Sequence, residues 1–149
     1  MKIAVGSDEK TVLTEALVED LRSRGHDLLL FGPLATEDPE VDWPLTSAKV
    51  AQAVAEGRAA QGIVCCWTGT GATIAANKVR GVRAALCHDA QTAKGARIWN
   101  HANVLAMSLR ATSPAIAKEI LEAWFSTPPS DDEWNLRQIA RVQELDERR

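Results

Sequence analysis

One stretch, residues 62–78 (GIVCCWTGTGATIAANK), constrains the fold of this chain more than any other. It opens with an apolar run, 63–66, whose small and β-branched side chains are typical of a strand buried on both faces of a parallel sheet. Gly69 and Gly71 follow, and then good helix formers. A strand, a glycine turn and a helix can cradle an anion, because glycines free backbone N–H groups and the helix adds its positive end. We therefore predict the functional centre at the end of this strand.

The rest of the chain alternates strand patterns with helical patterns. We predict strands at 2–5, 26–31, 63–66, 82–87 and 103–107, and helices at 12–24, 46–56, 72–77, 90–99, 114–125 and 133–147. The acidic segment 35–44 contains two prolines and lacks periodicity, so we expect a loop there. This order predicts an α/β fold, a three-layer Rossmann-like (flavodoxin-like) sandwich with a five-stranded parallel sheet and a C-terminal helix.

Composition narrows the class of protein. With 149 residues, of which 46% are hydrophobic, we expect one domain spanning 1–149. The net charge of −3 comes from scattered residues, which argues against a nucleic-acid partner. No apolar run approaches the roughly 20 residues of a membrane span, so we expect no membrane partner and a cytoplasmic protein. The three cysteines match no zinc spacing, and we expect them to be reduced thiols without metal.

The last helix carries an apolar stripe that finds few partners nearby in the sequence. Its members are Leu136, Ile139, Val142 and Leu145. A helix of this kind after a proline break often packs on another subunit. We therefore expect residues 130–149 to pack on a partner and the chain to form a homodimer, which could pair further into a tetramer.

Polar and thiol side chains gather where the predicted strands end. Parallel sheets of this type bind ligands at the carboxyl ends of their strands. The candidates there are Asp8, Glu9, the loop up to Trp43, residues 66–71, His88 and residues 108–110. Cys66 beside the glycine turn would have its thiolate form favoured by the helix end and the free N–H groups. The alternative is a small buried apolar residue, which is what we expect of Cys65 and Cys87.

Six segments together carry a resemblance to a known family. They read GSD at 6–8, DWP at 42–44, CWTGTG at 66–71, TIAANK at 73–78, GVRAALCHD at 81–89 and NHANVLAMSLR at 100–110. In this order and spacing they resemble the family of ribose-5-phosphate isomerase B and the galactose-6-phosphate isomerase subunits, over essentially the whole chain. The resemblance implies aldose-ketose isomerisation of a small sugar phosphate through an enediol, without metal or cofactor.

The resemblance also implies roles for individual residues. Cys66 would be the base that takes a proton from the carbon beside the carbonyl, and Thr68 would help to move a proton between oxygens. The N–H groups of Gly69, Thr70 and Gly71 would stabilise the enediolate. Substrate contacts would come from Asp8, Asn100, Arg110 and Arg137, the two arginines binding phosphate.

Three positions depart from the family pattern. Glu9 stands where a phosphate-binding histidine is usual, and Glu133 where a phosphate-binding arginine is usual. Trp99 replaces the histidine that opens the sugar ring. Trp43, Trp67 and Trp134 also occupy family pocket positions, so we expect a reshaped pocket in which aromatic faces meet the sugar, unless these rings only pack. Glu9 could equally be a helix-start residue, and Arg137 a solvated one.

These features leave three functions open. By family likeness the substrate is a pentose 5-phosphate. The charge reversals and Trp99 favour a tetrose phosphate or an unphosphorylated sugar. The third alternative is a non-catalytic sugar-binding protein that kept the fold.

Overall fold

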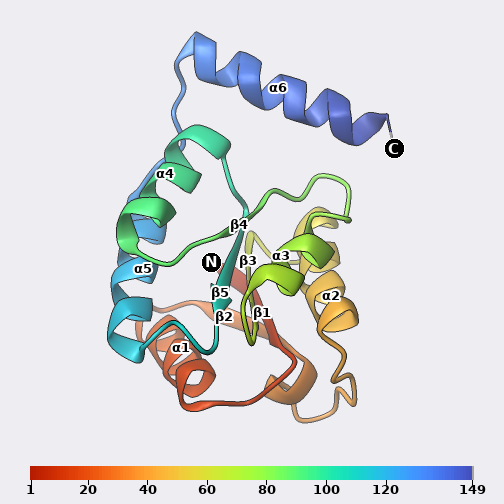
Figure 1. Ribbon diagram of the computed structural model, residues 1–149, viewed down its shortest axis with the longest axis vertical. Helices are drawn as coiled ribbons and strands as arrows, with labels where there is room; N and C mark the ends of the chain where they lie inside the picture. The colour runs from red at the N-terminus through yellow and green to blue at the C-terminus, as the bar shows by residue number, and fades with distance from the viewer. Residues whose placement is uncertain (149) are drawn as a thin grey trace.

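The computed structural model describes residues 1–148. Five parallel strands form one sheet in the order β2-β1-β3-β5-β4, and helices cover both of its faces (Figure 1). In chain order the elements are β1 (Lys2–Ser7), α1 (Val12–Ser23), β2 (Asp27–Phe31), the short 3-10 helix η1 (Gly32–Leu34), α2 (Trp43–Ala55), β3 (Gln61–Cys66), α3 (Thr70–Ala76), β4 (Ala84–Leu86), α4 (Ala90–Asn100), β5 (Val104–Ser108), α5 (Pro114–Ser126) and α6 (Glu133–Glu147). The predicted three-layer α/β fold is confirmed.

The two faces of the sheet carry separate cores, as alternation along the strands requires. On one face α1, α4 and α5 pack over side chains that include Ile63 and Cys65. On the other, α2 and α3 pack over side chains that include Val64 and Cys66. The two adjacent cysteines therefore belong to opposite layers, with Cys66 on the side of α2 and α3.

Helix starts follow the capping chemistry expected of their sequences. Asp89 begins α4 by accepting a hydrogen bond from the Thr92 N–H at 2.6 Å, and Ser113 begins α5 with Pro114 in its first turn. In α2 the helix begins at Trp43, three residues before the predicted start. Pro44 suits that first turn, where its missing N–H would have no partner within the helix.

Strand β4 and the strand order differ from a flavodoxin pattern. The predicted strand at 82–87 is shorter in the structure, where it covers Ala84–Leu86. Its first N–H groups bond to side-chain amides: Asn77 Oδ1 accepts from the Ala84 N–H and Asn103 Oδ1 from the Arg83 N–H. The flavodoxin order would place β4 beside β3. Here β5 pairs with β3, and β4 lies at the edge.

The acidic segment before α2 is held in place by one carboxylate. Asp38 accepts hydrogen bonds from the Gly32 N–H at 2.9 Å and the Glu40 N–H at 3.1 Å, and it binds Lys49 Nζ at 2.6 Å. The N–H donors, with Lys49, lower the pKa of Asp38 to about 2. This anchored loop delivers Trp43 to the edge of the sheet where β3 ends.

Helix α6 stands away from the sheet and is attached near its two ends (Figure 1). Near its start, the buried Asn135 side chain donates to the Ile98 carbonyl oxygen at 3.3 Å. Near its end, Asp146 accepts from the Gly81 N–H. Between these contacts lies a groove of about 710 Å³, lined partly by Trp99, Asn100 and Val142. Much of the α6 stripe is not buried by its own chain, since Leu136, Val142 and Leu145 are exposed.

No helix within residues 1–148 has the length and apolar character that crossing a membrane requires.

Candidate active site

Cys66 is fixed by the backbone on both sides of it. It is the last residue of β3, pairs with Ser108 of β5 and is only 5% exposed. Its carbonyl oxygen accepts hydrogen bonds from the Leu109 N–H at 3.0 Å and the Gly69 N–H at 3.1 Å. The thiol therefore projects from a rigid strand end and not from a mobile loop.

The sulfur of Cys66 accepts a hydrogen bond from the backbone. The Ala72 N–H, in the first turn of α3, donates to Cys66 Sγ at 3.4 Å. An N–H directed at sulfur stabilises negative charge on it. Burial raises the pKa of the Cys65 and Cys87 thiols to about 12. Those two stay protonated in water near neutral pH, in keeping with the packing role predicted for them.

The turn after Cys66 requires glycine at position 69. Gly69 has φ +77°, and a Cβ there would lie 2.6 Å from Leu86 Cδ1 and 2.9 Å from the Met107 carbonyl carbon. Its N–H donates to the Cys66 carbonyl, so the prediction that all three amides of 69–71 face a ligand needs correction. Only the Thr70 and Gly71 amides remain for that purpose, in a first helical turn that offers them no intrahelical acceptor.

Two threonine hydroxyls lie at the mouth of this turn. Thr68 Oγ1 and Thr70 Oγ1 are 2.7 Å apart and share a hydrogen bond. Both residues are exposed. The Thr68 hydroxyl was predicted to take part in the reaction and that of Thr70 was not, although the sequence TGTG already places the two side chains two residues apart around one glycine.

Two carboxylates follow β1 beside this turn. Asp8 comes directly after Ser7, which pairs with Cys65 of β3. Among the described residues, buried Asp8 Oδ1 has no hydrogen-bond partner, and burial raises the pKa of the Asp8 carboxyl above its ordinary value, with Glu9 adding to the shift. A buried acceptor without a partner is suited to a ligand hydroxyl. Glu9 is exposed.

Trp43, Trp67 and Arg110 complete this edge of the sheet. A Cβ on Gly71 would lie 2.9 Å from the Trp43 ring, so this indole lies directly against the first turn of α3. The Trp67 carbonyl accepts from the Arg110 N–H at 3.1 Å and from Ser108 Oγ at 2.9 Å. Arg110 is exposed and takes part in none of the ion pairs found within residues 1–148, which leaves its guanidinium open to an anion.

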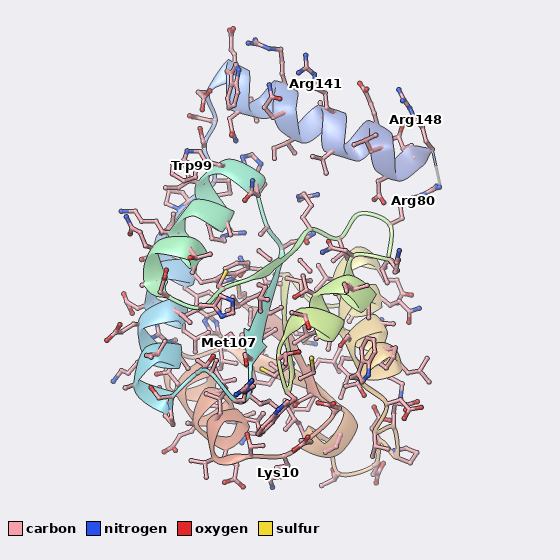
Figure 2. All side chains as sticks on the ribbon, viewed as in Figure 1. Lys10, Arg80, Trp99, Met107, Arg141 and Arg148 are labelled. Atoms are coloured by element: carbon pink, nitrogen blue, oxygen red, sulfur yellow. The ribbon has the colours of Figure 1, made fainter. Side chains whose placement is uncertain are left out.

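The remaining predicted site residues lie at the opposite end of the molecule. Trp99 and Asn100 end α4, close to the amino ends of the strands, and both line the groove under α6. Figure 2 shows Trp99 beside α6, whereas Lys10, two residues after Asp8, lies at the far end. Glu133 and Arg137 belong to α6 itself, with 4.0 Å between Glu133 Oε2 and Arg137 Nη1. One chain alone therefore does not bring this second group to Cys66.

The structure also places Trp99 and the histidine that follows it. A Cβ on Gly95 would lie 3.0 Å from the Trp99 ring, so the indole folds back along its own helix and stays 62% exposed. His101 ends the helix with φ +46°, and its Nε2 lies 2.8 Å from the Ser130 carbonyl oxygen. His101 thus ties α4 to the segment before α6 and lies far from the thiol.

The groups near Cys66 are a thiol, backbone amides, hydroxyls and a carboxylate. Within residues 1–148 no group of three or more His, Cys, Asp or Glu side chains is arranged to hold a metal ion. What the strand edge does bring together is a buried thiol with an N–H donor, two open amides, two linked hydroxyls and an unpartnered carboxylate oxygen. Such a set can remove a proton from carbon and stabilise the oxyanion that results.

Comparison with known proteins gives consistent matches over most of the chain. Residues 3–145 match the family model described as Ribose/Galactose Isomerase. The chain is 36% identical over 125 residues to D-erythrulose-4-phosphate isomerase of Pectobacterium atrosepticum, covering 83% of this chain and 82% of the relative. It is 39% identical over 124 residues to ribose-5-phosphate isomerase B of Escherichia coli, with the same shares covered.

Solved structures agree with these sequence matches. Ribose-5-phosphate isomerase B of Clostridium thermocellum superposes with a TM-score of 0.90 at 34% identity, covering 99% of each chain. The enzyme of Mycoplasma genitalium, solved with bound ribulose-5-phosphate, gives a TM-score of 0.87 at 28% identity and covers 98% of this chain and 96% of its own.

Proposed function

The chain is a sugar phosphate isomerase of the ribose/galactose isomerase family, and we propose that it works through an enediol with Cys66 as its base. The observation that carries this proposal is the N–H of Ala72 directed at Cys66 Sγ. The position of Cys65 supports the assignment to Cys66. Cys65 is the preceding residue and carries the same thiol, but its side chain is buried on the other face of the sheet.

The residues divide the reaction between them. The Cys66 thiolate takes the proton from C2 of an aldose, the electrons of that C–H bond form the C1–C2 double bond, and the π electrons of the carbonyl move onto O1 as the enediolate forms. The open amides of Thr70 and Gly71 stabilise that charge. A hydroxyl then moves the O2 proton to O1, the Cys66 thiol returns its proton to C1, and O2 becomes the ketose carbonyl. Asp8 Oδ1 accepts a hydrogen bond from a sugar hydroxyl.

Arg110 supports a phosphorylated substrate. Its open guanidinium can bind phosphate oxygens in a bidentate manner. Glu133 weakens Arg137 only slightly, because their 4.0 Å contact is between side chains that are 97% and 59% exposed. Arg110 and Arg137 therefore still offer positive charge to a phosphate despite the carboxylates of Glu9 and Glu133.

A four-carbon sugar phosphate is the substrate that Trp99 favours. Indole N–H only donates a hydrogen bond and acts as neither an acid nor a base near neutral pH, so Trp99 cannot assist ring opening. A tetrose 4-phosphate has its O4 esterified and cannot close a five-membered ring, so it needs no such help. The Pectobacterium relative is named for a four-carbon substrate of this kind. A pentose 5-phosphate is the other candidate, favoured by the relatives named for ribose 5-phosphate.

A substrate panel tests the function and the choice of sugar. We expect kcat/KM for erythrulose 4-phosphate to exceed that for ribose 5-phosphate by at least about tenfold, with the free sugars far behind both. The measurement is NMR in deuterated water, which follows both isomerisation and deuterium entry beside the carbonyl. Equal turnover of ribose 5-phosphate would overturn the four-carbon proposal, and no deuterium entry from any sugar would overturn the isomerase proposal itself.

The separation of the two groups of site residues supports an active site completed by a second copy of the chain. Arg137 and Asn100 can approach Cys66 only from another subunit. The α2 and α3 surface near Cys66 exposes Leu45 and Ile74, and α6 exposes its own apolar stripe. A two-fold dimer that covers one surface with the other creates two identical sites.

Mixing two inactive variants tests this arrangement. Cys66→Ala and Arg137→Ala each damage every site of their own homodimer. A mixed dimer contains one site with both residues intact, so an equal mixture that exchanges subunits should regain about a quarter of wild-type activity. Native mass spectrometry confirms that mixed dimers are present. Mixed dimers without any regained activity would show that both residues act within one chain or that Arg137 is not needed.

A further inference from the structure

The hydroxyls of Thr68 and Thr70 form a pair in which both members face solvent beside the Cys66 turn. Their oxygens lie 2.7 Å apart. The residue between them, Gly69, is held by two hydrogen bonds to its carbonyl oxygen, from Thr73 Oγ1 at 2.7 Å and from the Thr73 N–H at 3.1 Å. The backbone that carries the two hydroxyls is therefore held in place by hydrogen bonds on the helix side of the turn.

We propose that the pair is a two-hydroxyl relay that carries a proton from O2 to O1 of the enediol, with Thr70 as a second catalytic hydroxyl. This inference rests on the proposed isomerase function, and it adds Thr70 to Thr68, the hydroxyl to which the family resemblance gives that task. The separation of the pair is close to that of two oxygens on adjacent carbons of a cis-enediol. Each hydroxyl can thus face one substrate oxygen at the same time.

The relay balances without any other reactant. In a pair of hydrogen-bonded hydroxyls, one donates its hydrogen to the other, which leaves the donor with free lone pairs and the acceptor with its own hydrogen free. The O2 hydrogen moves to a free lone pair of the donating threonine, the shared hydrogen moves to the accepting threonine, and the hydrogen of the accepting threonine moves to O1. Both threonines end as neutral hydroxyls, and the negative charge has passed from O1 to O2. A lone threonine would have to turn between accepting and donating.

The alternative is a hydrogen bond that only stabilises the turn, and comparing two rates separates the two roles. Deuterium entry at the carbon beside the carbonyl, C2 of an aldose or C1 of a ketose, reports proton removal by Cys66, whereas conversion to the isomer also requires the shift between oxygens. If Thr70 belongs to the relay, its loss should slow conversion and leave deuterium entry intact. If it only supports the turn, both rates should change together or not at all.

The experiment uses the Thr70→Val variant of the full chain, which keeps the branched shape and the backbone amide but removes the hydroxyl. We expect conversion of the best substrate to fall roughly 10- to 100-fold while deuterium entry stays within about twofold. Thr70→Ser should restore conversion, because it returns the hydroxyl. Thr92→Val, at an exposed threonine in the first turn of α4, serves as the matched control and should leave both rates unchanged.

Either of two results overturns the relay. Thr70→Val could convert substrate at the wild-type rate, or it could lose deuterium entry and conversion equally. The wild-type protein keeps these results apart from failure of the isomerase proposal, because absence of deuterium entry in the wild type with every sugar phosphate contradicts the function and not the relay alone.

Discussion

Replacing Cys66 by alanine is expected to lower deuterium entry into the substrate by roughly 10²- to 10⁴-fold. The variant removes the sulfur atom toward which the Ala72 N–H is directed, and with it the proposed base. Cys66→Ser should lose as much, because a serine hydroxyl is a far weaker base at neutral pH than a thiolate. The measurement is the same NMR assay in deuterated water, with folding checked by circular dichroism.

Cys65→Ala is the matched control for this result. Cys65 is the preceding residue of β3 but belongs to the opposite helix layer, and burial raises its thiol pKa to about 12. Its removal should leave deuterium entry unchanged. Iodoacetamide should correspondingly modify Cys66 in the native protein, and substrate should protect it. Wild-type exchange in Cys66→Ala would remove the thiol from the mechanism.

The Gly69→Ala variant is expected to lose about 3 kcal/mol in the free energy of unfolding. Part of the loss is the left-handed backbone, since φ at this position is +77°. The rest is steric, because the added Cβ would lie 2.9 Å from the Met107 carbonyl carbon and 3.0 Å from its oxygen, and this backbone belongs to β5, which is paired on both sides in the sheet. Urea denaturation measures the change.

Gly57→Ala separates the two contributions. Gly57 has a similar φ of +72°, yet a Cβ there would meet nothing within 4 Å. Its substitution should therefore cost only the backbone part, about 1 kcal/mol. If Gly69→Ala is no less stable than Gly57→Ala, then the turn relaxes freely and the close approach to β5 does not require glycine.

Local sequence patterns were sufficient to predict the elements of this fold but not how they pair. The apolar run 63–66, the helix caps at Asp89 and Ser113, and the stripe of the last helix each act within a few residues, and each appears in the structure. The neighbour of β3 is decided by contacts between distant segments. Nothing in residues 82–87 shows that β5 and not β4 pairs with β3.

The candidate site was predicted in part for the same reason. Cys66, Asp8 and Arg110 each follow or end a strand, and parallel strands bring those positions to one edge. Asn100 ends a helix that runs back to the start of β5, so topology carries it to the other edge. Family likeness assigned both kinds of residue to one pocket, and only the three-dimensional arrangement reveals that a single chain separates them.

Loop contacts were the least predictable. The segment before Trp43 has the acidic, proline-containing composition of an open loop, and Asp38 looks like any other acidic residue in it. Its partners Gly32 and Lys49 are close only after β2 and α2 have packed. A single carboxylate then orders a segment for which no periodic pattern exists.

Because the two neighbouring cysteines face opposite helix layers, an error in the register of β3 would affect catalysis. If β3 were to slide by one residue against β1 and β5, each of the two sulfur atoms would move to the other face of the sheet, and Cys66 would be buried beneath α1, α4 and α5. The chain could keep nearly all of its secondary structure in that state and still be catalytically inactive. Fidelity of strand alignment is thus as much a requirement of catalysis here as the identity of the thiol.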